Sequence, residues 1–387
     1  MFLQNISPVI NYTDPWKIPY EERIKSLARG QRRVAYFYEN PDNSTFRYRV
    51  YNMIQSLQES RNGTSAAYFH NEDPDILNKV IDIADVLVVC RSKYSDKLNR
   101  VITSARSKGK PVFFDVDDLV FDPAYVHLVL DTLDQDLDHP SVWDHWFAYV
   151  GRIGATMKLC DRAIATNPYL AARLQPHFDK PVSVIPNFLN RQQMEISRKI
   201  FQCKKSMKFV RTNYIHLGYF SGTPSHNKDL EVVSDALALL MESDPRITLR
   251  VVGFIDLRGP LQRYSSRIER YPLQDFENLQ RLIGEVEVNL VPLQDNEFTN
   301  CKSELKYFEA GIVGTVTIAS PIYTYAKAIQ DGQNGYLATS FEWCDKIQIL
   351  LDSLDSYPEI AEKAFNDSEQ KYAWYNQVDL LEKNLFS

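Results

Sequence analysis

The sequence predicts an α/β protein built from two doubly wound parallel sheets. Apolar, strand-like runs alternate with amphipathic helices at steps of roughly 20–30 residues, which is typical of strand–helix–strand units. Residues 84–90 (ADVLVVC) form one continuous apolar strand in this prediction, as strands buried on both faces tend to do. The chain has 387 residues, which is long for one domain and sufficient for two.

The first sheet is predicted to begin with a strand at residues 34–38 (VAYFY). A loop rich in turn-forming residues, 39–45, follows it, and a helix opens at Phe46. Ligands of doubly wound sheets bind at the carboxyl ends of the strands, so this loop is a candidate site. The other strands predicted for this unit cover residues 65–70, 84–90, 110–115, 160–167 and 181–187, and its helices cover residues 21–33, 46–58, 74–83, 95–108, 122–160 and 168–174.

A second set of alternating elements starts at residue 214. The segment before it, 198–211, is basic and irregular, and we predict an interdomain linker there. Exposure to solvent explains its charge more simply than contact with a membrane, which stays an alternative. The strands predicted for the second unit cover residues 214–220, 247–253, 286–292 and 315–320, and its helices cover residues 230–241, 275–283 and the chain from 341 onward.

Bulk composition excludes several classes of function. The net charge of −6 at pH 7 argues against general nucleic-acid binding. No apolar run approaches the ~20 residues that span a bilayer, and the first residues lack the basic start and apolar block of a signal peptide. The five cysteines are scattered and form no CxxC pair, so neither a zinc site nor a disulfide framework is expected. We therefore predict a cytoplasmic protein.

The stretch at residues 300–311 (NCKSELKYFEAG) lies between two strand-like runs. Lys302, Lys306 and Glu309 are spaced so that a helix would place all three on one side. Ser303 is a candidate cap for this helix, whose first turn would then offer free N–H groups to an anion. Two cations at a helix start suit a diphosphate, and a later carboxylate suits a sugar diol. A solvated, charged helix face explains the same spacing, so both interpretations stay open.

Three carboxylates, Asp115, Asp117 and Asp118, follow the strand predicted at 110–115. Their position at the carboxyl end of a strand favours a ligand site for one or two of them. Two aspartates at this spacing suit Mg²⁺ or Mn²⁺ on a diphosphate. Alternatively, two of the three cap the following turn.

Residues 309–320 (EAGIVGTVTIAS) resemble the donor-site segment of GT-B glycosyltransferases, especially retaining family 4. In that family a glutamate, matched here by Glu309, holds the ribose of a nucleotide-sugar. The resemblance implies that Lys302, Ser303 and Lys306 also bind the donor. Family members usually have another glutamate eight positions before this one, where this chain has Cys301. The group that faces the transferred sugar must therefore come from elsewhere.

The loop after residue 220 resembles the corresponding loop of the same family. Family 4 places Gly-Arg in this loop and Lys-Gly at its end, both directed at the donor diphosphate. Gly222 matches the glycine, Thr223 stands in the arginine's place and Lys228 matches the lysine. The resemblance implies a catalytic role for Lys228, which would stabilise the leaving diphosphate. His226 in the same loop is a further donor-binding candidate.

On the first unit, the order CDRAIATN, helix, PVSVIPN at residues 160–187 also resembles family 4. Asp117 takes the place of a histidine that faces the transferred sugar in the family, and Asp118 is a second catalytic candidate. Asp117 could bind sugar hydroxyls, stabilise positive charge or help to deprotonate an acceptor. Arg47 and Arg49 stand where many members have a glycine-rich loop. We expect them, with Asp115, on the acceptor or phosphate side, unless an arginine pairs with a carboxylate of its own domain.

The resemblance implies the GT-B fold, in which two Rossmann-like domains face each other across a cleft. It implies transfer of a hexose or deoxyhexose from a nucleotide-sugar to a glycan or lipid-linked acceptor, with retention and with neither a cofactor nor an essential metal. It also suggests bacterial surface-polysaccharide synthesis, at the inner face of the membrane if the basic segments touch it. A nucleotide-sugar epimerase and a catalytically silent binding partner are the alternatives. The predicted division is a first domain at 1–195, a linker at 196–212, a second domain at 213–369 and a C-terminal helix at about 370–387 that crosses back to the first domain.

Overall fold

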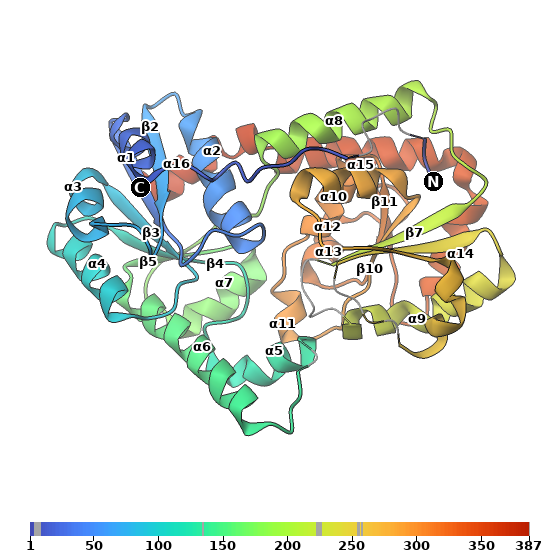
Figure 1. Cartoon of the computed structure of the whole chain (residues 1–387), viewed down its shortest axis with the longest axis horizontal. Helices are drawn as coiled ribbons and strands as arrows, with labels where there is room; N and C mark the ends of the chain where they lie inside the picture. The colour runs from blue at the N-terminus through green and yellow to red at the C-terminus, as the bar shows by residue number, and fades with distance from the viewer. Residues whose placement is uncertain (4–8, 134, 222–226, 254–255, 257, 387) are drawn as a thin grey trace.

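The computed structural model describes residues 1–3, 9–133, 135–221, 227–253, 256 and 258–386. It contains two lobes, each built on a six-stranded sheet whose strand pairs are all parallel (Figure 1). The first sheet consists of β1 (Arg32–Phe37), β2 (Thr64–Phe69), β3 (Val86–Cys90), β4 (Val112–Val116), β5 (Arg162–Ala165) and β6 (Val182–Val184). The second sheet consists of β7 (Ile215–Phe220), β8 (Ile247–Val252), β9 (Ile268–Tyr271), β10 (Val288–Val291), β11 (Val316–Ala319) and β12 (Tyr336–Leu337).

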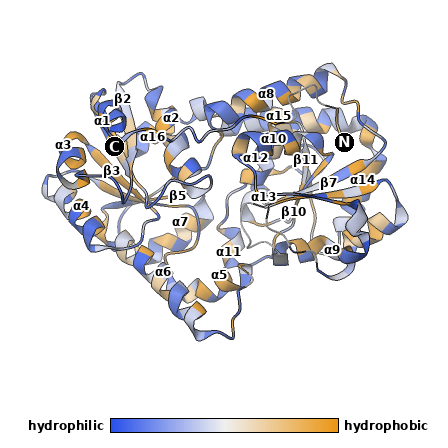
Figure 2. Ribbon diagram, in the orientation of Figure 1, coloured by the Kyte–Doolittle hydropathy of each residue, from blue (hydrophilic) through white to orange (hydrophobic). Residues whose placement is uncertain are grey.

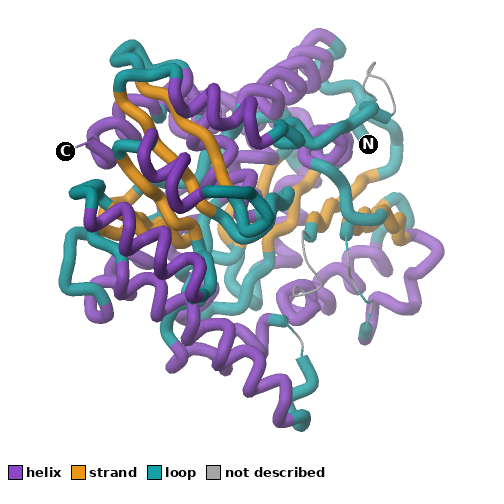
Figure 3. The backbone as a smooth tube through the Cα atoms, turned by 60° about the vertical axis from the view of Figure 1, so that its left-hand side comes forward, coloured by secondary structure: helices purple, strands orange, loops and turns teal. Residues whose placement is uncertain are grey.

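Helices flank both faces of each sheet, and the strands lie in the middle of each lobe (Figures 2 and 3). Strands such as β3 are buried along their whole length, as the continuous apolar sequence predicted. The helices of the first lobe are α1 (Tyr20–Ala28), α2 (Asn52–Gln58), α3 (Ile81–Ile83), α4 (Asp96–Ser107), α5 (Val126–Thr132), α6 (Pro140–Leu159) and α7 (Pro168–Leu174). Those that follow are α8 (Arg191–Ser206), α9 (Asn227–Ser243), α10 (Phe276–Glu285), α11 (Glu297–Asn300), α12 (Leu305–Gly311), α13 (Tyr323–Ala328), α14 (Trp343–Asp352), α15 (Tyr357–Tyr372) and α16 (Val378–Phe386).

The strand orders place one switch point in each sheet. The first sheet has the order β2-β1-β3-β4-β5-β6, and the second has β12-β11-β10-β7-β8-β9. The chain therefore reverses its direction of travel between β1 and β3 in one lobe and between β7 and β10 in the other. Ligands of such sheets bind outside the carboxyl ends of the strands at these points.

The segment predicted as an irregular linker is helical over most of its length. Helix α8 begins after Asn190, whose side chain accepts a hydrogen bond from the backbone N–H of Gln193 at 2.8 Å. Met194, Ile200 and Phe201 are buried on one side of it. The prediction of an irregular segment at 198–211 was therefore wrong as far as Ser206, because basic side chains on the exposed face concealed this apolar stripe.

The end of the chain returns to the first lobe, as predicted. Helix α16 packs on α2, beside the blue first lobe in Figure 1. The carboxylate of Glu382 on α16 accepts hydrogen bonds from Ser60, Asn62 and Thr64. The returning chain runs beside the outgoing one, because the N–H of Leu189 donates to the carbonyl of Tyr372 at 2.8 Å.

The beginning of the chain lies on the second lobe, although the sequence prediction assigned all of residues 1–195 to the first. The N–H of Phe2 donates to the carbonyl of Glu285 at 2.8 Å, and Phe2 forms an antiparallel bridge with Arg211. By Trp16 the chain contacts both lobes, since this indole packs against Phe46 of the first and Phe276 of the second. In the described part of the chain, Phe2 on the second lobe and Trp16 between the lobes therefore add a further link at this end.

No helix within the described ranges is both long enough and apolar enough to cross a membrane.

Candidate active site

A cleft of about 560 Å³ lies between the two lobes. The carboxyl ends of both sheets open into it, through Tyr38 after β1 and Arg91 after β3 on one side and Ser221 after β7 on the other. This is where switch points of doubly wound sheets hold ligands. Seven residues that the sequence singled out line it: Arg47, Asp117, Asp118, Lys302, Ser303, Lys306 and Glu309.

Glu309 on α12 is bound by side chains from outside its own lobe. Its Oε1 accepts hydrogen bonds from Arg47 Nη2 at 3.2 Å, from Gln193 Nε2 at 3.1 Å and from the hydroxyl of Tyr48. Glu309 is 3% exposed and Arg47 is 5% exposed, so this ion pair is shielded from water. All three of these bonds end on the same oxygen of the carboxylate.

The loop after β1 fixes Arg47 and Tyr48. Asp42 Oδ1 accepts hydrogen bonds from the backbone N–H groups of Ser44 at 2.8 Å and Phe46 at 3.2 Å. The chain then forms a π-helical stretch, Arg47–Tyr51, a geometry that often accompanies functional sites. The wider turn brings adjacent side chains, Arg47 and Tyr48, to one carboxylate. Sequence reasoning named Arg47 and missed Tyr48, because consecutive residues of an ordinary helix do not face each other.

Arg49 and Asp115 form a buried pair outside the cleft. Arg49 Nε and Nη2 donate to the two oxygens of Asp115 at 2.8 and 2.9 Å, and the residues are 0% and 1% exposed. Arg49 Nη1 also donates to the carbonyl of Ile185 at 2.9 Å. Burial raises the pKa of Asp115 above its usual value in spite of this arginine. Arg49 is therefore the arginine that pairs within its own domain, which was the alternative noted from the sequence. Arg47 lines the cleft, as expected.

Asp117 and Asp118 both bind Arg91, which the sequence analysis did not identify. Arg91 Nη1 donates to Asp117 Oδ1 at 3.0 Å and to Asp118 Oδ2 at 3.1 Å, and Thr45 Oγ1 donates to Asp117 Oδ2 at 2.8 Å. Arg91 adopts φ 36°, an uncommon value for a residue with a side chain. The available signal was its position directly after the apolar strand at residues 84–90.

Electrostatics keep Asp117 ionised. Burial acts to raise its pKa, but Arg91 and the hydrogen bond from Thr45 outweigh burial and lower the pKa below the usual value of an aspartate. Burial likewise disfavours the charged form of Arg91, and Asp117 and Asp118 outweigh it and raise the pKa of the guanidinium.

The two lysines of the central stretch lie on either side of the start of α12. This helix begins at Leu305, its N-cap is Glu304, and no side chain caps it, so the prediction that Ser303 caps the helix was wrong. Lys302 therefore lies in the turn before the helix and not on a common helical face with Lys306. Ser303 instead accepts a hydrogen bond from Asn187 Nδ2 of the first lobe at 2.9 Å.

The ammonium group of Lys306 lies in a buried part of the cleft. Burial lowers its pKa to about 8, and Asp229 and Glu309 offset only part of that effect while Lys302 adds to it. Its Nζ lies 5.3 Å from the centroid of the Tyr219 ring. Lys302 and Lys306 place two positive charges close together in this cleft. An anionic ligand would offset the repulsion between them and the cost of burying their charge.

Lys228 on α9 lies outside this group of cleft-lining residues. Its ammonium forms an ion pair with Asp131 on α5 of the first lobe, and each side chain is about one-third exposed. Gly222, Thr223 and His226 lie outside the residues that the structure describes. Of the site residues predicted in this loop, Lys228 is therefore the one that the structure describes.

Cys301, which stands where the family resemblance led us to expect a glutamate, faces the core of the first lobe. Cys301 is 0% exposed and packs with Phe298 into the apolar cluster of that lobe. Burial raises the pKa of its thiol. Its carbonyl accepts a hydrogen bond from Asn167 Nδ2 at 2.8 Å. Cys301 of the second lobe therefore packs against the first lobe and is not among the residues that line the cleft.

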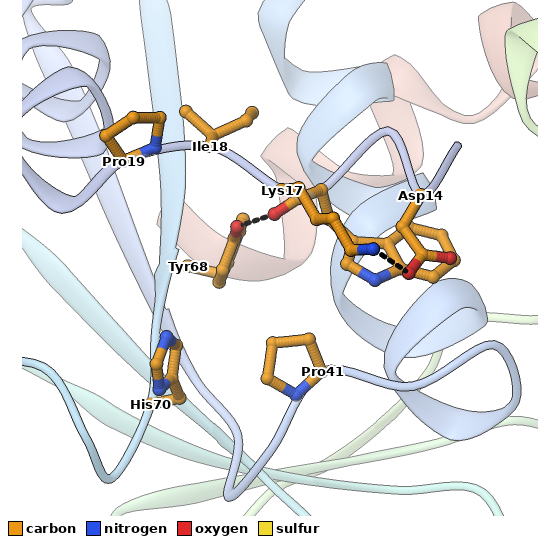
Figure 4. A pocket seen from close by; sticks show the side chains of 8 residues that line it. Asp14, Lys17, Ile18, Pro19, Pro41, Tyr68 and His70 are labelled. Atoms are coloured by element: carbon orange, nitrogen blue, oxygen red, sulfur yellow. Dashed lines mark hydrogen bonds and ion pairs between the residues drawn. The ribbon is translucent and has the colours of Figure 1, made fainter.

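A second cavity, of about 410 Å³, lies beyond the loop after β1 (Figure 4). Figure 4 shows Pro41 and His70 on one side of it and Pro19 and Tyr68 on the other. The hydroxyl of Tyr68 is already bonded to the carbonyl of Trp16, and Lys17 pairs with Asp14 at 3.4 Å. Among the described residues, no cluster of three His, Cys, Asp or Glu side chains is placed to hold a metal ion, here or in the main cleft.

Comparisons with known proteins agree with this geometry. Residues 215–353 match the family model "Glycosyl transferases group 1". A search of curated proteins found no significant match.

Several solved structures share the fold over nearly the whole chain. Anabaena HepE, solved in complex with UDP, is 14% identical, with a TM-score of 0.60 and coverage of 91% of this chain and 99% of HepE. Sucrose-phosphate synthase from Thermosynechococcus elongatus is 14% identical, with a TM-score of 0.58 and coverage of 91% and 98%. A glycosyltransferase from Rickettsia africae is 12% identical, with a TM-score of 0.56 and coverage of 92% and 98%. These likenesses establish the GT-B fold for this chain.

Proposed function

We propose that this chain, a GT-B protein whose second lobe matches group 1 glycosyltransferases, transfers a sugar from a nucleotide-sugar to an acceptor hydroxyl. The observation that carries the proposal is the composition of the cleft. Its second-lobe wall holds two lysines, a serine and a buried glutamate, and its first-lobe wall holds the ionised Asp117. Cations on one wall and a carboxylate on the other suit a substrate whose diphosphate leaves as its sugar becomes positive.

The donor binds along the second-lobe wall in this proposal. Lys302 and Lys306 neutralise the diphosphate, Ser303 donates a hydrogen bond to it, and the carboxylate of Glu309 accepts from the ribose hydroxyls. Anabaena HepE has been solved with UDP-glucose, which supports a nucleotide-sugar of this kind. Lys228 joins this set only after its ion pair with Asp131 is exchanged for the phosphate.

The sugar and the acceptor bind along the first-lobe wall. The bond between the anomeric carbon and the diphosphate oxygen breaks, the acceptor oxygen bonds to that carbon, and the acceptor proton leaves with the released nucleoside diphosphate. Because its pKa is lowered, Asp117 suits stabilisation of positive charge on the sugar better than removal of a proton. Asp118 shares Arg91 and supports that charge.

The finer parts of the proposal follow the family resemblance. The transferred sugar is a hexose or deoxyhexose, its anomeric configuration is retained, and the reaction uses no cofactor or essential metal. The acceptor is a glycan or a lipid-linked molecule. The reaction belongs to bacterial surface-polysaccharide synthesis at the cytoplasmic face of the membrane. Arg91 supports independence from metals, because its guanidinium holds the position between Asp117 and Asp118 that a divalent cation would need.

A catalytically silent binding protein is the second candidate, since Cys301 stands where family 4 usually has a glutamate and its side chain is buried between the lobes. A thermal-shift screen of UDP-, GDP-, dTDP- and ADP-linked sugars identifies the donor, because a ligand that binds only the folded state raises apparent stability. NMR of the stabilising donor, alone and with acceptors, then separates the candidates. Transfer to an acceptor supports the proposal, conversion of donor alone indicates an epimerase, and binding without either indicates the silent partner.

Replacing Lys302 and Lys306 by methionine tests the diphosphate site directly. We expect kcat/KM to fall by at least a hundredfold, since charge-assisted contacts to the leaving group act mainly in the transition state. Lys327, an exposed lysine of α13, provides the matched control as Lys327→Met. Unchanged kcat/KM in the double variant would contradict the assignment of Lys302 and Lys306 to the diphosphate.

A further inference from the structure

The helices α5 and α6 form a hairpin that extends away from the first sheet (Figure 1). α6 is 20 residues long, and its second half is held in the lobe by buried Val150, Ile153 and Met157. Its first half leaves the lobe, and Phe147 is 46% exposed there. A single exposed apolar side chain needs no explanation, but a contiguous group of them beside a cleft marks a candidate binding site.

Aromatic side chains continue from the cleft along this first half. Trp146 and Tyr149 line the cleft, with ring centroids 5.2 Å apart. Trp143 lies nearer the start of the helix and stacks near Phe147, with centroids 6.2 Å apart and ring planes 28° from parallel. Of the four rings, Phe147 is exposed, while the other three also pack on the buried cluster of the hairpin. Trp143 is fixed in place, because its Nε1 donates to the carbonyl of Leu137 at 2.9 Å. The stripe formed by these four rings spans about 9 Å of helix axis.

The charge of the hairpin decides which ligand fits the stripe. The segment 126–151 contains five aspartates and neither lysine nor arginine. Asp136, Asp138 and Asp144 are exposed. Anionic lipid surfaces attract basic segments and repel acidic ones, so this composition argues against a membrane contact. Carboxylates accept hydrogen bonds from hydroxyl groups, and rigid aromatic faces cover apolar surface at a low entropic cost.

We propose that the stripe of Trp143, Trp146, Phe147 and Tyr149 is a subsite for an uncharged oligosaccharide acceptor. The terminal sugar of the acceptor lies at Asp117, and the preceding sugars stack outward along the stripe while their hydroxyls bind the nearby aspartates. This inference rests on the proposed function and adds the class of acceptor to it. Contacts that bind the acceptor equally in the ground state and in the transition state lower KM for long acceptors without raising kcat, and we assign the stripe to this kind of contact.

Phe147→Ala is the test, because this side chain is exposed and its removal leaves the lobe core intact. Phe341→Ala is the matched control, since Phe341 is 96% exposed and lies on the second lobe. Each variant is assayed for binding to an array of neutral and acidic glycans and to vesicles of phosphatidylcholine and phosphatidylglycerol. The KM for neutral acceptors from mono- to hexasaccharide is then measured with the donor that the thermal-shift screen identifies.

We expect Phe147→Ala to weaken neutral-glycan binding and to raise KM for the longer acceptors roughly fivefold to tenfold. KM for a monosaccharide acceptor, and kcat, stay at wild-type values, as do all properties of Phe341→Ala. The inference is overturned if Phe147→Ala raises KM equally for short and long acceptors, or if the wild-type protein retains no glycan on the array. It is also overturned if Phe147→Ala loses vesicle binding and keeps glycan binding. Failure of the proposed function looks different, because no donor would then turn over while the array still reports glycan binding.

Discussion

At the scale of single residues, the buried pairing of Arg47 with Glu309 sets a stability cost for removing either of the two side chains. Glu309→Leu leaves a guanidinium that is 5% exposed without its carboxylate. We expect a loss of about 3–5 kcal/mol in the free energy of unfolding, as measured by urea denaturation. The double variant Glu309→Leu with Arg47→Met recovers most of this loss but not the nucleotide affinity. Wild-type stability in the single variant would show that Arg47 does not depend on Glu309.

Lys306 gives nucleotide binding a pH dependence with a definite sign. Its pKa is lowered to about 8, so the free protein loses this positive charge as pH rises through 8. Bound diphosphate favours the cation, and affinity therefore falls between pH 7 and pH 9. Since the folded-state pKa lies below the unfolded value, the free energy of unfolding of the ligand-free protein rises with pH above 8.

Isothermal titration with the nucleoside diphosphate across this range checks the expectation. The variant Lys306→Met serves as the control, and its affinity should be lower and nearly independent of pH. A wild-type affinity that stays flat from pH 7 to 9 would contradict a role for Lys306 at the phosphate.

At the scale of elements, α11 and the turn after it attach the second lobe to the first. Cys301→Glu restores the residue expected from family 4 but inserts a carboxylate into the apolar cluster that Phe298 and Cys301 share with the first lobe. We expect it to lower the thermal midpoint by several degrees without raising kcat, because a buried unpaired charge is strongly unfavourable. Cys301→Ala is the control for volume. Higher activity in Cys301→Glu would mean that residue 301 reaches the sugar.

The elements also show how far sequence reasoning reaches. Apolar runs such as β3 were predictable because burial on both faces leaves a continuous signal. The GT-B fold and the return of α16 to the first lobe are confirmed by the structure and its similar folds. Helix α8 was missed because its exposed face carries most of its charge. Tyr48 and Arg91 were missed because a π-helical turn and a positive φ decide where they point, and neither has a sequence period.

At the scale of the whole molecule, several predicted site residues of the second lobe contact side chains of the first lobe. Ser303 binds Asn187, Glu309 binds Arg47 and Lys228 binds Asp131, and each pair joins the two lobes. In the proposed function, donor binding would exchange these contacts between lobes for contacts with the ligand. The proposed donor site would for this reason link its occupancy to the relative position of the lobes.

The return of α16 to the first lobe also dictates the order in which the protein can complete its structure during synthesis. All six strands of the first sheet are synthesised by residue 184, but the helix that covers α2 is made only at residues 378–386. At ordinary elongation rates roughly 10–40 s separate the two events. During that interval the surface that later buries Leu381 is uncovered, and Ser60, Asn62 and Thr64 wait for Glu382. The first lobe is thus the first to be synthesised, but its surface is completed only at the end of synthesis. Until then this surface of the nascent chain is open to aggregation or chaperone binding.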